Sequence, residues 1–134
     1  VLEFRRVLFR SEGHEDIDLV SLVYGKFINE PKVNTFTGIS GSSPAFIYML
    51  MEAMADCGVN NGMTRQDAYD FVSQSVLGAA KMLRDTKKHP GELKDAVTSP
   101  GGTTIAGVAA LEEAGFRSAI MYGIQAAIDR AKEM

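Results

Sequence analysis

One stretch limits the possible folds more than any other. Residues 45–57, AFIYMLMEAMADC, carry only two charged side chains, Glu52 and Asp56. A helix that is apolar on nearly all sides has to be buried, and a chain of 134 residues has little else to cover it. We therefore predict a helical protein that associates with itself to bury this helix.

Helix signals continue along the rest of the chain. Thr64 followed by Asp67 is a capping pattern for a long helix, which His89 and Pro90 end before a short helix over GELKDAV. Gly115 separates two further helices, the second with its apolar residues on one stripe. Residues 31–57 are predicted to contain two helical segments that meet at SGSSP.

Composition excludes several classes of protein. The chain fits one domain, and its net charge of −3 with scattered basic residues argues against nucleic-acid binding. No run approaches the roughly 20 apolar residues of a membrane helix. The single cysteine, Cys57, forbids an internal disulfide and is typical of the cytoplasm. His14 and His89 have no second ligand at metal-binding spacing, so we predict no metal site.

The segment VTSPGGTT, residues 97–104, is the strongest candidate site. It precedes a helical pattern, and the first amides of a helix, together with its dipole, bind anions. Glycines allow a ligand close to the backbone, and the hydroxyls of Ser99, Thr103 and Thr104 offer further hydrogen bonds. No lysine follows Gly102 as it would in a P-loop, so a carboxylate fits better than a nucleoside triphosphate. The alternative is a connection whose proline and glycines only shape a turn.

A second candidate is GISGSSPAF, residues 38–46, where small residues recur at helical spacing. Tight helix packing is its simpler interpretation. No G-x-G-x-x-G fingerprint for a dinucleotide occurs in the chain.

HPGELKD, VTSPGGTTIAG and TGISGSSPAF together resemble pyrroline-5-carboxylate reductase, and the similarity runs from about Asp16 to Met134. The resemblance implies an all-α, interwoven dimerisation domain at 31–134, preceded by a helix-strand remnant of a Rossmann domain at 12–30. Residues 1–11, VLEFRRVLFRS, are expected to be a non-native leader, with an amphipathic segment as the alternative. Ser43 departs from the family, which usually has glycine there.

The resemblance also implies site residues and a reaction. Ser99, Gly102, Thr103 and Thr104, with the amides of 102–104, would hold the carboxylate of a cyclic imino acid. Thr104 would lie near the ring nitrogen and assist proton transfer, and Thr37 and Ser40 would approach the nicotinamide of NADPH or NADH. The full-length enzyme would reduce 1-pyrroline-5-carboxylate to L-proline as a homodimer or higher oligomer, in the cytoplasm.

Two alternatives stay open. The chain could be a non-catalytic helical association module, or the C-terminal domain of another dinucleotide-dependent reductase. Because nothing in it cradles a pyrophosphate, the isolated chain is expected to be inactive.

Overall fold

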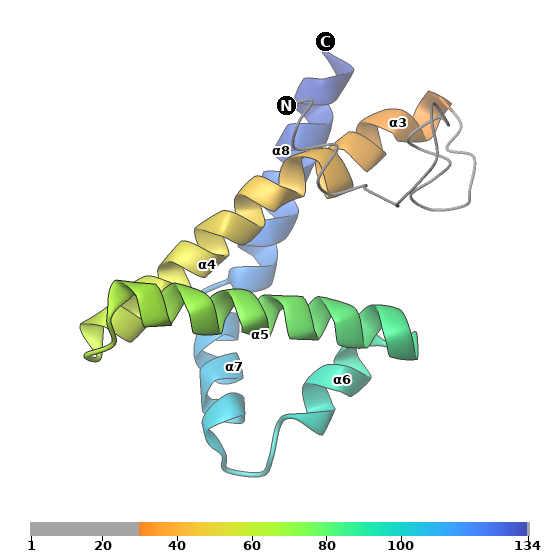
Figure 1. Ribbon diagram of the computed structural model, residues 1–134. Helices are drawn as coiled ribbons and strands as arrows, with labels where there is room; N and C mark the ends of the chain where they lie inside the picture. The colour runs from red at the N-terminus through yellow and green to blue at the C-terminus, as the bar shows by residue number, and fades with distance from the viewer. Residues whose placement is uncertain (1–29, 134) are drawn as a thin grey trace, which may run out of the picture. The chain divides into compact units, whose positions relative to one another are not determined.

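The computed structural model describes residues 30–133, and these residues are helical with short connections (Figure 1). The elements in chain order are α3 (Glu30–Phe36), the π-helical turn η1 (Thr37–Ser42), α4 (Ser43–Asn60), α5 (Arg65–Thr86), α6 (Pro90–Ala96), α7 (Thr103–Glu113) and α8 (Phe116–Lys132). The all-α prediction is confirmed. The predicted leader at 1–11 and nearly all of the predicted helix-strand remnant lie outside the described residues.

Two compact units divide the chain. Among the described residues, one unit comprises 30–44 together with 123–133, and the other is Ala45–Tyr122. In its described part the first unit holds α3, η1 and the end of α8. The second unit holds most of α4, all of α5, α6 and α7, and the start of α8.

In the second unit a short turn joins α4 to α5, and the two helices diverge from this turn (Figure 1). The turn between them is a Schellman motif, because Met63 N–H bonds the Gly58 carbonyl and Gly62 N–H bonds the Val59 carbonyl. Gly62 supplies the required left-handed conformation at φ 96°. The helices touch closely beyond it, since a Cβ at Gly58 would lie 3.4 Å from the Cβ of Ala68.

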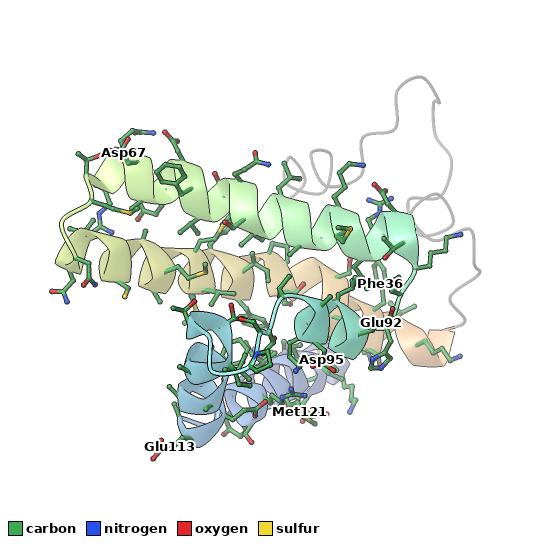
Figure 2. All side chains as sticks on the ribbon, turned by 90° about the horizontal axis from the view of Figure 1, so that it is seen from below. Phe36, Asp67, Glu92, Asp95, Glu113 and Met121 are labelled. Carbon is green, nitrogen blue, oxygen red and sulfur yellow. The ribbon has the colours of Figure 1, made fainter. Side chains whose placement is uncertain are left out.

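The predicted helix boundaries are confirmed at three places. The Thr64 hydroxyl accepts a hydrogen bond from Asp67 N–H at 3.1 Å at the start of α5, where Figure 2 labels Asp67. His89 caps α6 by accepting from Gly91 N–H at 3.0 Å, and Pro90 is its first residue. Gly115 follows α7 at φ 76°. The predicted junction at SGSSP differs in detail, because the helical path continues through η1 without a break.

The core of the described residues is small. Buried hydrophobic residues are Ala55, Ala68, Val72 and Ile128. Large apolar side chains stay exposed on α4, α5 and α8, including Met49 at 67% and Tyr122 at 80%. Exposed apolar surface of this extent is typical of a chain that is covered by a partner.

Candidate functional site

The loop before α7 is built on a tight turn. Gly102 N–H bonds the Ser99 carbonyl at 3.1 Å, with Pro100 and Gly101 at the two central positions. Gly101 has φ 65°, which with a preceding proline is typical of a type II turn. Pro100 and Gly101 are therefore explained by the turn alone.

Gly102 is required by its neighbour Ser99. A Cβ on Gly102 would lie 2.3 Å from Ser99 Oγ and 3.2 Å from the Ser99 carbonyl oxygen. The serine side chain thus folds over the backbone at the start of α7. The conformation of the loop therefore requires glycine at residue 102, whether or not a ligand also approaches there.

The loop is anchored on its other side by α6. Thr98 N–H bonds the Asp95 carbonyl at 3.0 Å, and the Thr98 hydroxyl donates to the Lys94 carbonyl at 2.5 Å. Figure 2 shows Asp95 on α6, where its carboxylate pairs with Lys94. These contacts use the carbonyls at the end of α6 and hold Thr98, the residue before the turn, in place.

At the start of α7 several hydrogen-bond donors remain available. Gly102 is the N-cap residue and has no side chain to cap the helix, and no acidic residue lies in the first turn. The Ala106 N–H is the first to bond back, to the Gly102 carbonyl. The amides of residues 103–105 therefore point out of the helix with the positive end of its dipole behind them.

This geometry changes one expectation. The Gly102 N–H is already used by the turn, so the available amides are those of residues 103–105 rather than 102–104. Thr103 and Thr104 are exposed, and within residues 30–133 their hydroxyls have no hydrogen-bond partner. Ser99 is exposed as well, while Gly102 is half-buried. The arrangement can accept a small carboxylate or another small anion.

Thr37 and Ser40 lie in η1, in the first unit, whereas the loop before α7 lies in the second. Both are half-buried. The Thr37 hydroxyl donates to the Val33 carbonyl at 3.0 Å, so its oxygen keeps lone pairs that can accept an N–H, such as that of a carboxamide. The Thr37 oxygen is therefore able to accept a hydrogen bond from the amide end of a nicotinamide.

His89 has a structural role, because it is the cap of α6 described above. Of the residues that the structure describes, no group of His, Cys, Asp and Glu is placed to hold a metal ion, and no helix among them is long and apolar enough to cross a membrane. His14 lies outside the described residues.

The π-helical turn η1 was not predicted from the sequence. A signal was present in Pro44, which stands four residues after Ser40 inside a helical run. Proline cannot donate to the carbonyl four residues earlier, and its ring presses against that carbonyl in a regular α-helix.

The chain is similar in sequence to a known protein family and to characterised members of it. Residues 30–134 match the family model described as pyrroline-5-carboxylate reductase dimerisation. The chain is 49% identical over 107 residues to pyrroline-5-carboxylate reductase of Escherichia coli K12, covering 80% of this chain and 40% of that protein. It is 48% identical over 125 residues to the enzyme of the same name from Pisum sativum, covering 90% and 46%.

Solved structures are similar as well. The 1-pyrroline-5-carboxylate reductase of Streptococcus pyogenes matches with a TM-score of 0.79 and 42% identity, over 81% of this chain and 42% of that one. The pyrroline carboxylate reductase of Plasmodium falciparum, solved with NADP bound, matches with a TM-score of 0.76 and 34% identity, over 79% and 40%. The chain thus spans less than half the length of these relatives.

Proposed function

Since the chain belongs to the pyrroline-5-carboxylate reductase dimerisation family, we propose that it is the dimerisation and substrate-binding part of an enzyme that reduces 1-pyrroline-5-carboxylate to L-proline. In this proposal the chain acts in the cytoplasm as a homodimer or higher oligomer. A preceding dinucleotide-binding domain would hold most of the NADPH or NADH, whose bound nicotinamide supplies the hydride. The fragment alone is expected to be inactive, because no described residue forms a pyrophosphate cradle.

The observation that carries the proposal is the uncapped start of α7. Its amides at 103–105 and the adjacent hydroxyls of Thr103 and Ser99 would hold the substrate carboxylate. Hydrogen bonds to a charged acceptor contribute about 1.5–3 kcal/mol each at best. The exposed position in the isolated chain lowers this figure, since water competes for every donor.

Thr104 is assigned to the ring nitrogen. Reduction adds a hydride to the imine carbon and leaves the ring nitrogen with one more hydrogen than the neutral imine, so a proton has to be present at that nitrogen. A threonine hydroxyl can hold this proton in a hydrogen bond but is too weak an acid to be its final source. Thr104 would therefore orient the imine and relay a proton from water.

An NMR titration of the purified chain with L-proline tests the carboxylate site. Ser99→Ala and Thr103→Val should each weaken the binding of L-proline about tenfold. L-prolinamide should not bind, because it lacks the negatively charged carboxylate. Ser118→Ala, at an exposed serine of α8, is the matched control and should bind like the unaltered chain. Equal binding of proline and prolinamide would contradict a carboxylate site.

Activity is tested in a full-length protein, made by placing the amino-terminal domain of the Escherichia coli relative before this chain. We expect oxidation of NADPH that depends on the imine, and none from the chain alone. A folded chimera with no such activity would contradict the assignment as a reductase. It would favour a helical association module.

A further inference from the structure

The π-helical turn η1 has a local cause in the sequence. In a regular α-helix the N–H of residue 44 would bond the carbonyl of Ser40, but Pro44 has no N–H and its ring needs the space. Widening the turn to the π pattern moves that carbonyl away from the ring. The turn ends at Ser42, two residues before the proline.

Ser43 compensates for the same proline. In a π pattern residue 44 would donate to the carbonyl of Ile39, which Pro44 again cannot do. The Ser43 hydroxyl donates to that carbonyl instead, at 2.6 Å. The serine found where the family usually has glycine therefore satisfies a backbone group of η1.

A second contact holds the turn from outside. Gly38 is the buried residue of η1, and a Cβ there would lie 2.4 Å from Ile128 Cγ1 and 3.2 Å from the carbonyl oxygen of Ile124. Ile128 is itself buried. The end of α8 thus packs directly on the backbone of η1, where only glycine fits.

We propose that Gly38 and Pro44 are positioning residues, which keep η1 in its π form so that Thr37 and Ser40 meet the nicotinamide correctly. This inference rests on the proposed function. One residue added to a helical turn rotates everything before it by about 100° relative to the helix that follows. A return to the α form would therefore turn Thr37 away from its direction relative to Ser43 and Pro44 without unfolding the helical run.

Pro44→Ala separates this role from a merely structural one. Alanine restores an N–H and favours a regular helix, so the melting temperature of the chimera described above should stay equal or rise. The Michaelis constant for NADPH should nevertheless rise about tenfold, with a smaller fall in kcat, because the hydroxyls are misplaced. Backbone chemical shifts of residues 37–42 in the isolated chain report whether the turn has become α-helical.

Gly38→Ala tests the outside contact, and its rescue provides the control. The added methyl group should displace α8 and raise the Michaelis constant for NADPH. In the double variant Gly38→Ala with Ile128→Ala, both clashing side-chain carbons of Ile128 are gone, so cofactor affinity should return at least in part. Ile128→Ala alone serves as the reference for the lost packing.

The outcomes are distinguishable. If the chimera reduces the imine, and Pro44→Ala converts the turn while the Michaelis constant and kcat stay within about twofold, the positioning role is wrong. If the shifts show that the π turn persists in Pro44→Ala, the proline is not its cause and the proposal is wrong as well. If the unaltered chimera binds no NADPH and has no activity, the proposed function fails.

Discussion

At the residue scale, the glycines differ in whether the structure would tolerate a side chain at their position. Gly101 has φ 65°, a conformation that alanine adopts only with strain. Gly107 lies inside α7, and a Cβ there would meet nothing within 4 Å. Substitution by alanine should therefore have opposite effects on the free energy of unfolding at these two positions, which lie six residues apart.

Gly101→Ala should lower the free energy of unfolding by about 1 kcal/mol because it strains the turn. Gly107→Ala should raise it by up to about 1 kcal/mol, since alanine is the better helix former. Urea denaturation of the two variants and the unaltered chain at one protein concentration measures the difference. Destabilisation of equal size by both variants would show that the described turn is wrong.

Thr104→Ala is a second prediction at this scale. In the full-length chimera it should lower kcat by about tenfold to a hundredfold while the affinity for proline changes less, because the hydroxyl is assigned to the ring nitrogen. Steady-state kinetics and proline titration are compared in the same variant. A loss of proline affinity with unchanged kcat would contradict this assignment and indicate that Thr104 contacts the substrate carboxylate.

At the element scale, the hydroxyl of Thr64 is the cap that begins α5. It accepts from Asp67 N–H and also donates to Asp67 Oδ2 at 2.7 Å. Thr64→Ala should cost about 1 kcal/mol of stability, and Thr64→Ser should recover most of it. Hydrogen exchange at the first amides of α5 would rise in the alanine variant only; unchanged protection there would exclude a capping role.

The last turn of α8 should respond to acid. Hydrogen bonds from Lys132 and Gln125 lower the pKa of Asp129 below its ordinary value. A carboxylate with a lowered pKa in the folded state stabilises that state above the pKa of the unfolded chain, and the contribution is lost as the pH falls through the folded value. Because the group is exposed, the effect on overall stability should be small.

Carboxyl carbon shifts of Asp129 followed by NMR measure its titration directly. Lys132→Gln should move the midpoint of the Asp129 titration upward, toward the ordinary value. Lys81→Gln, which removes the separate ion pair of Lys81 with Asp85, serves as the control. An unchanged midpoint in Lys132→Gln would contradict the stated cause. Added salt should reduce the difference between the Asp129 titration midpoints of the two variants.

The sequence predicted these elements where the signal was local. Thr64 with Asp67, His89 with Pro90, and Gly115 each mark a boundary through groups within a few residues, and each was confirmed. The use of the Gly102 amide by the turn was not predicted, because it depends on the conformation of Gly101. The contact of Gly38 with Ile128 could not be predicted either, since the two positions lie 90 residues apart in the sequence. Assignment of Ser99, Thr103, Thr104, Thr37 and Ser40 to ligands stays a prediction.

At the scale of the whole molecule, the exposed apolar residues predict self-association. Sedimentation at micromolar concentration should show a dimer or larger species, and the melting temperature should rise with protein concentration. Met49→Glu should weaken association because it places a charge on an apolar helix face. Gln74→Glu adds the same charge at an exposed polar position of α5 and should leave association unchanged. A stable monomer of the unaltered chain would contradict the prediction.

The small core also has a consequence inside the cell. A newly made copy without a partner would display Met49, Tyr122 and the other exposed apolar side chains to chaperones and proteases. Its lifetime should therefore depend on how quickly it meets a second copy. Under the proposed assembly, the amount of enzyme in a cell would fall more than proportionally when synthesis slows, because scarce subunits are degraded before they pair.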